Sequence, residues 1–167
     1  PYFLAPSHFF SDDAVPAIFQ SVLNGINYPD IPTIYGPSLQ YSFLLGYWLT
    51  PGNVQGLQII YAAVDVALIL VLAQLTRSRW AVFLYAWNPL VVKEIAFTAH
   101  PDGFGVFFLM LACLCAGRQR YWGVVVFLAV SVCAKPFAWF IAPFILWNTP
   151  RRYWLVFTVS VITLYLP

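Results

Sequence analysis

A short turn between two apolar segments holds the chain's most suggestive group of side chains for chemistry. It reads Ala99-His100-Pro101-Asp102-Gly103, with an imidazole and a carboxylate two residues apart. Such a pair can hold a metal ion or orient a phosphate and sugar hydroxyls, and the proline fixes the backbone of the turn. An Asp before an apolar run also often caps the helix that follows. We predict that His100 and Asp102 are catalytic, a role that is compatible with capping by Asp102.

A single lysine interrupts a second apolar stretch. Lys135-Pro136 separates two runs of about 14 and about 11 residues, which at about 1.5 Å per residue are too short to span a membrane. Their joining turn should therefore lie at the floor of an outward-open cavity. An ammonium there suits a phosphate, which it meets as a point charge. The alternative is that Lys135 snorkels to the outer membrane interface. We predict that it binds a substrate phosphate.

Three further ionisable residues lie in apolar segments, where a charge is costly and needs a partner. Glu94 lies roughly a turn and a half before His100, so we expect it either to support substrate binding or to form a structural pair. Lys93 is its sequence neighbour, and the two side chains are expected to point apart rather than to pair. For Asp65 we expect a hydrogen bond from Asn88 on the next helix.

The composition places these residues in a membrane protein. The 167 residues are 62% hydrophobic and 8% charged, whereas a soluble domain is about a quarter charged. Backbone amides in hydrocarbon must pair within the protein, and unbroken apolar runs favour helices over a barrel. The net charge of +2 comes from scattered basic pairs and not from a basic stripe, so nothing indicates a nucleic-acid partner and we expect none. The predicted fold class is all-α, a polytopic transmembrane helix bundle.

Turn signals and segment lengths divide the chain into three parts. Residues 1–37 are rich in proline and form an outer loop. Residues 38–50 are too short for a core that needs about 20 residues, and we expect an interfacial helix. Residues 54–166 form the transmembrane bundle, with helices expected over 54–75, 80–98, 103–116, 121–134, 137–147 and 153–166. In the loop, Asp30 and Tyr35 belong to a rigid segment that walls a sugar site or anchors the loop to the membrane.

Basic pairs at every second junction predict the orientation. Arg77 with Arg79, Arg118 with Arg120, and Arg151 with Arg152 should lie in the cytoplasm. The turn at 99–103, the turn at 135–136 and the loop 1–37 should then face outward. The chain begins at Pro1 without an initiator Met, which we interpret as a fragment.

The order of these motifs resembles that of a family of membrane enzymes. The segments that carry the resemblance are Asn27–Pro37, Tyr85–Leu90 with Glu94, Ala99–Gly103 and Lys135-Pro136. Together they look like polytopic glycosyltransferases of the GT-C superfamily, and within it the bacterial polyprenol-phosphate-mannose-dependent mannosyltransferases, similar to glycosyltransferase family 87. The family turn more often reads Gly-His-Asn-Asp, from which Ala99 and Pro101 depart.

The resemblance implies an integral enzyme of the bacterial inner membrane. It would move a hexose, expected to be mannose, from a polyprenyl-phosphate sugar to a hydroxyl of a glycan or lipid acceptor on the outer face. It implies that Asp102 takes the acidic second-loop position beside His100 and that Lys135 faces the lipid phosphate. From the residue types themselves, Mg²⁺ or Mn²⁺ is a candidate ion at Asp102. The resemblance also implies that the principal base precedes Pro1 and that the fragment is inactive alone.

A transporter or flippase is the alternative from another class. The intramembrane residues Asp65, Lys93, Glu94 and Lys135 could form a path for an ion or a polar substrate. Against this, the sequence shows no internal repeat and no matched pair of broken segments, which transporter folds typically contain.

Overall fold

The computed structural model describes residues 4–10 and 15–166, and every regular element in this part of the chain is a helix. The all-α prediction is therefore confirmed. Residues 1–3 and 11–14 of the predicted outer loop lie outside the described residues. In chain order the elements are η1 (Pro6–Phe9), η2 (Ala17–Phe19), α1 (Gln20–Asn24), α2 (Pro37–Leu49), α3 (Gln55–Leu75), α4 (Arg79–Ala86), α5 (Pro89–Val91), the π-helical turn η3 (Val92–Phe97), α6 (Asp102–Gly117), α7 (Tyr121–Val132), α8 (Phe137–Trp147) and α9 (Arg152–Tyr165).

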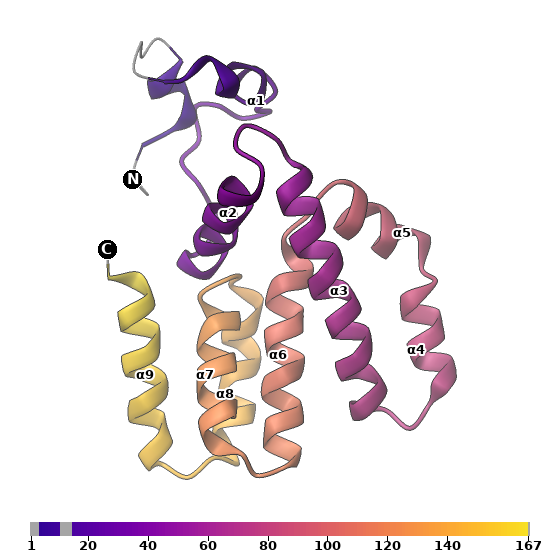
Figure 1. The fold of residues 1–167 in the computed structure, drawn as a ribbon. Helices are drawn as coiled ribbons and strands as arrows, with labels where there is room; N and C mark the ends of the chain where they lie inside the picture. Colours follow the sequence, from indigo (N-terminus) through magenta and orange to yellow (C-terminus); the bar gives the residue numbers. More distant parts are fainter. Residues whose placement is uncertain (1–3, 11–14, 167) are drawn as a thin grey trace.

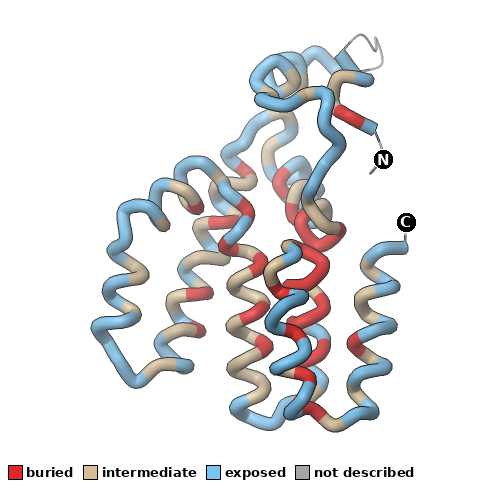
Figure 2. Tube along the Cα trace, turned by 180° about the vertical axis from the view of Figure 1, so that it is seen from behind, coloured by how far each residue is buried: buried red, intermediate tan, exposed pale blue. Residues whose placement is uncertain are grey.

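Helix α7 is the centre of the packing. It contacts α6, α8 and α9, while α3 packs on the other side of α6 and carries α4 at its edge (Figure 1). The buried residues concentrate in these inner helices (Figure 2). Small side chains at Ala112, Ala129, Ala138 and Ala142 are buried in the core cluster, and they let the helices approach closely, as in membrane bundles.

The predicted helices match the observed ones closely where proline or basic turns delimit them. Helix α8 has the predicted bounds, and α3, α6, α7 and α9 differ by one or two residues. The predicted helix over 80–98 is wrong, because it breaks at Asn88-Pro89. Pro89 has no N–H to continue the helix, and the Asn88 side chain accepts a hydrogen bond from the Leu90 N–H at 3.0 Å to start a new turn.

Membrane-spanning length is found in fewer helices than the sequence suggests. Among the described residues, α3 is long and apolar enough to cross a membrane, and α5–η3 with α6 pass the same test together although they are bent by 109°. Helices α7, α8 and α9 are apolar but shorter. The all-helical fold is therefore established, and the number of crossings stays a prediction.

The basic turns lie together at one end of the helices. The turns that join α3 to α4, α6 to α7 and α8 to α9 are at the lower end in Figure 1. At that end, Arg118 Nη2 donates a hydrogen bond to Gln74 Oε1 at 2.8 Å. The N-terminal loop and the turns before α6 and before α8 lie toward the opposite end, so the fold separates the basic turns from the candidate site.

Candidate active site

The turn before α6 has a constrained backbone. Ala99 has φ 54°, a left-handed conformation that is uncommon for a residue with a Cβ. The His100 N–H donates to the Glu94 carbonyl at 2.8 Å, and Thr98 Oγ1 donates to the same carbonyl at 2.7 Å. A Cβ on Gly103 would lie only 2.9 Å from Ile95 Cδ1. These contacts fix the positions from which His100 and Asp102 project.

The turn between α7 and α8 carries Lys135. Its N–H donates to the Ser131 carbonyl at 3.2 Å, and Pro136 follows as the residue before α8. The buried Ser131 Oγ donates to the Gly105 carbonyl at 2.7 Å, which holds α7 against α6. The two turns that the sequence singles out are therefore carried by helices locked to each other.

Lys135, Asp102 and His100 form one continuous cluster. The Lys135 ammonium lies 2.6 Å from Asp102 Oδ1, and His100 Nε2 lies 3.2 Å from Asp102 Oδ2. The lysine side chain is 18% exposed, whereas those of Asp102 and His100 are about half exposed. Asp102 is the first residue of α6, and its side chain makes no capping hydrogen bond. The structure therefore does not show Asp102 as a capping residue of α6, although a carboxylate is electrostatically favoured at a helix N-terminus.

The segment before α2 closes over the Lys135 turn. The Gly36 and Ser38 N–H groups donate to the Ala134 and Cys133 carbonyls at 3.4 and 3.3 Å. A Cβ on Gly36 would overlap the Cys133 carbonyl, so this close approach requires glycine. We call residues 33–37 the strap.

The strap places an aromatic ring against the lysine. The Lys135 ammonium lies 4.8 Å from the centre of the Tyr35 ring, which is a cation–π contact. Gln40 Nε2 holds the strap by donating to Thr33 Oγ1 at 2.9 Å and to the Tyr35 carbonyl at 3.4 Å. Lys135 is thus held between an aromatic ring and a carboxylate.

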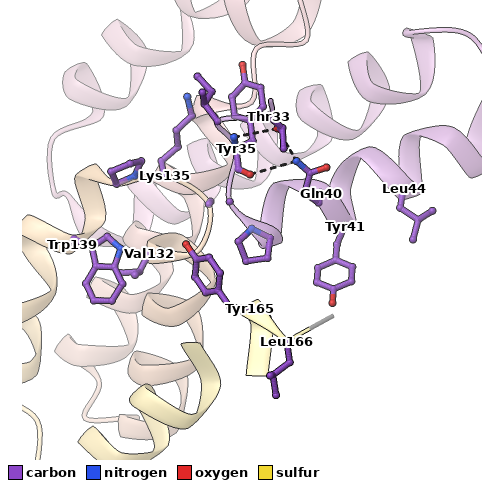
Figure 3. A pocket seen from close by; sticks show the side chains of 15 residues that line it. Thr33, Tyr35, Gln40, Tyr41, Leu44, Val132, Lys135, Trp139, Tyr165 and Leu166 are labelled. Atoms are coloured by element: carbon purple, nitrogen blue, oxygen red, sulfur yellow. Dashed lines mark hydrogen bonds between the residues drawn. The ribbon is translucent and has the colours of Figure 1, made fainter. Parts of the chain in front are cut away.

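A cavity of about 850 Å³ opens beside Lys135. It has a polar end formed by Lys135, Thr33 and Gln40, and its remaining walls are mostly apolar (Figure 3). The other lining residues come from the strap, α2, α7, α8 and the end of α9, and they include Tyr41, Leu44, Val132, Trp139 and Leu166. One cation at the end of an apolar cavity is suited to an amphiphilic anion.

Comparison with known proteins identifies the family. A family model of the N-terminal domain of alpha-(1->6)-mannopyranosyltransferases, the MptA_B family, matches residues 30–151, which is well over half of the chain. The chain belongs to this family. The matched segment contains the strap, the turn before α6 and the Lys135 turn, and it confirms the resemblance to mannosyltransferases. No curated protein and no solved structure matches the sequence.

Two predicted pairings in this mannosyltransferase domain are wrong. Lys93 and Glu94 do pair, at 2.9 Å, because both side chains are exposed and the long lysine can bend back to its neighbour. Asp65 accepts its hydrogen bond from the Tyr85 hydroxyl at 2.7 Å and not from Asn88, which caps α5 instead. Tyr85 precedes Asn88 by three residues, so the sequence indicates the correct segment but not the correct donor.

The predicted substrate-binding residues occupy different places. Lys135 and Tyr35 line the cavity. Glu94 does not line it, and its carbonyl accepts the hydrogen bond from the His100 N–H. Asp30 is exposed in the turn where the Ile31 N–H bonds to the Tyr28 carbonyl, and it does not line the cavity. Gln40 was not predicted, because an uncharged polar residue in a helix gives no signal for a role that depends on tertiary contact.

The residues of this candidate site do not fit a divalent metal ion. Within residues 4–10 and 15–166, no three His, Cys, Asp or Glu side chains come together as metal ligands. His100 and Asp102 supply only two donors, and one oxygen of Asp102 faces the Lys135 ammonium, which would repel a cation. The Mg²⁺ or Mn²⁺ site suggested for Asp102 therefore has no support in this geometry.

Proposed function

We propose that this domain binds mannose linked to a polyprenyl phosphate and transfers the sugar to an acceptor hydroxyl on the outer face of the membrane. The observation that carries the proposal is the position of Lys135. Lys135 lines a largely apolar cavity, and its ammonium lies between the Tyr35 ring and the Asp102 carboxylate. A soluble nucleotide sugar would have little use for the apolar walls, whereas an isoprenoid chain would be buried by them.

In this arrangement each part of the donor meets matching chemistry. The phosphate binds the Lys135 ammonium, and the first isoprene units lie along the cavity walls at Val132, Trp139 and Leu44. The mannosyl group then extends toward Asp102 and His100, which are exposed enough to receive it. Asp102 and His100 act there as hydrogen-bonding partners of the sugar hydroxyls near the reacting carbon.

The proposed transfer is an inverting displacement at the anomeric carbon. The bond from that carbon to the acceptor oxygen forms while the bond to the phosphate oxygen breaks, and its electron pair leaves with the polyprenyl phosphate. Lys135 stabilises the negative charge that develops on the leaving group. A carboxylate base takes the acceptor proton. The family description, alpha-(1->6)-mannopyranosyltransferase, favours a primary C6 hydroxyl as the acceptor.

The proposal places the domain in the membrane as a polytopic bundle with the site outward. Large apolar side chains are exposed on the outer faces of the helices, among them Trp80, Phe140, Phe144, Trp147 and Leu155. Exposure on this scale is unusual for a water-soluble monomer. The basic turns lie at the end opposite the site, and the positive-inside rule makes that end cytoplasmic. In a bacterium the enzyme would therefore work at the outer face of the inner membrane.

A transporter is now the weaker interpretation. A transport path would need intramembrane charges that are available to an ion or a polar substrate, but Asp65 bonds to Tyr85 and Lys135 pairs with Asp102. The match to a mannosyltransferase family also favours the enzyme.

Transfer of radiolabelled mannose by membranes that contain the full-length parent protein tests this function. Polyprenyl-phosphate mannose and GDP-mannose are compared as donors, with Lys135→Ala and Asp102→Asn as variants and Arg77→Ala as the control at the opposite end. We expect transfer from the lipid-linked donor alone, with loss of at least about 100-fold in both site variants, the size typical for removal of a charge-stabilising group. Transfer from GDP-mannose, or unchanged rates in both site variants, would refute the proposal.

A further inference from the structure

A polar surface lies beyond His100, away from the cavity. It is formed by η3 and the residue after it, and it presents Lys93, Glu94, Phe97 and Thr98. We call these four residues the ledge. None of them lines the cavity, and the ledge joins the candidate site through the hydrogen bond from the His100 N–H to the Glu94 carbonyl. The described site therefore has two sides, with the cavity at Lys135 and the ledge next to His100.

The ledge combines the groups that bind sugars. Glu94 Oε1 lies 2.9 Å from the Lys93 ammonium, and Thr98 Oγ1 lies 3.2 Å from Glu94 Oε2. These contacts hold the carboxylate in one orientation, with acceptor capacity left for hydroxyl donors. Phe97, the residue before Thr98, is 74% exposed. A carboxylate, an ammonium, a hydroxyl and an exposed ring offer hydrogen bonds for sugar hydroxyls and a flat surface for the apolar face of a pyranose ring.

The backbone under the ledge is fixed before any ligand binds. Gln58 Nε2 on α3 donates to the Phe97 carbonyl at 2.6 Å, and the Thr98 N–H donates to the Lys93 carbonyl at 3.0 Å. The segment is a π-helical turn, a form found frequently at functional sites. A preorganised surface loses little conformational entropy on binding, so weak contacts to a sugar can still give useful affinity.

The geometry of an inverting transfer decides which substrate the ledge serves. The acceptor must attack the anomeric carbon on the face opposite the leaving group. The cavity is lined by α2, α7, α8 and the end of α9, whereas η3 packs on α3. With the phosphate at Lys135 and the sugar at Asp102 and His100, the face opposite the leaving group would therefore point toward η3. We infer that the ledge binds the acceptor glycan, by a mannose residue stacked on Phe97 and hydrogen-bonded to Glu94. This inference rests on the proposed function for the position of the donor.

The kinetic test uses the full-length parent protein, lipid-linked mannose at a fixed saturating concentration, and octyl α-mannoside as a soluble acceptor. In Phe97→Ala and Glu94→Gln we expect the acceptor KM to rise about tenfold, while the donor KM stays within about twofold, because a residue that contacts only one substrate changes the KM for that substrate. Phe144→Ala is the matched control. Phe144 is 76% exposed on α8 and lines neither the cavity nor the ledge, so this variant should keep both KM values.

Direct binding separates this inference from the proposed function. Titration calorimetry with octyl α-mannoside and no donor should show that the parent and Phe144→Ala bind the mannoside. The Phe97→Ala and Glu94→Gln proteins should bind it at least about fivefold more weakly. The inference would be overturned if both ledge variants kept the parent's mannoside affinity and acceptor KM. Continued transfer from the lipid-linked donor in those variants would show that the proposed function still holds. Loss of mannoside binding in both ledge variants would support the inference even if the donor proved to be a different mannose carrier.

Discussion

Replacement of Gly36 by alanine tests whether the strap must close over Lys135. The new Cβ would overlap the Cys133 carbonyl, a backbone atom that cannot move aside independently. The strap would therefore have to lift. The hydrogen bonds from Gly36 to Ala134 and from Ser38 to Cys133 would break, and Tyr35 would leave the Lys135 ammonium.

The expected size of this effect follows from the contacts that are lost. Two backbone hydrogen bonds contribute about 0.5–1.5 kcal/mol each, and a cation–π contact contributes about 0.5–1 kcal/mol at a partly exposed site. The closed strap should therefore lose about 1.5–4 kcal/mol, which lowers its population relative to the lifted form by about tenfold or more. Since the strap forms one wall of the cavity, we expect donor affinity to fall by at least about tenfold.

The assay is the donor KM for mannose transfer by the full-length protein in membranes. Gly25→Ala is a suitable control, because Gly25 belongs to the same N-terminal region and its added Cβ would find ordinary contacts at 3.4 and 3.6 Å. We expect Gly25→Ala to bind the donor like the parent. A Gly36→Ala protein with the parent's donor KM would show that strap closure is not needed for donor binding, and the reasoning from the Gly36 contact would be wrong.

Two buried or half-buried hydrogen bonds yield stability predictions. Ser131→Ala removes the bond to the Gly105 carbonyl between α7 and α6. That carbonyl lies within α6 and keeps its helical backbone partner, so we expect a loss of about 0.5–1.5 kcal/mol, the net contribution of one hydrogen bond. Thermal unfolding in detergent measures this loss, and an unchanged Tm would contradict the prediction. Tyr85→Phe leaves Asp65 without its hydroxyl donor and should lower stability by a similar amount. In the second case, an unchanged Tm would mean that Asp65 finds another partner.

The sequence predicts segments better than it predicts contacts. Helix α8 was predictable because Pro136 stands before its first residue, and Asn148 and Pro150 follow its last. The grouping of His100, Asp102 and Lys135 at one end of the helices was also predictable, since basic turns mark the opposite end. Both inferences depend only on order along the chain and on the number of residues between turns.

The contacts within the site depend on how each helix is rotated, and that is where prediction from sequence fails. Helices that are apolar on every side give little periodic signal for rotation, so the sequence indicated the segment that partners Asp65 but not Tyr85 itself. The cation–π contact of Tyr35 with Lys135 depends on the strap bending back onto α7. Gly36 is the local sign of that approach. The reason for a glycine there becomes clear only when the position of the Cys133 backbone is known.

The pairing of Lys135 with Asp102 also bears on the release of product. In the proposed function, the Lys135 ammonium exchanges the Asp102 carboxylate for a phosphate when the donor binds. The net gain in binding free energy is therefore smaller than it would be at an unpaired ammonium. When spent polyprenyl phosphate leaves, Asp102 is within 2.6 Å to take its place, and no bare charge is left behind. The carboxylate therefore limits how tightly the spent carrier lipid is retained, which favours its return to the membrane and the start of another catalytic cycle.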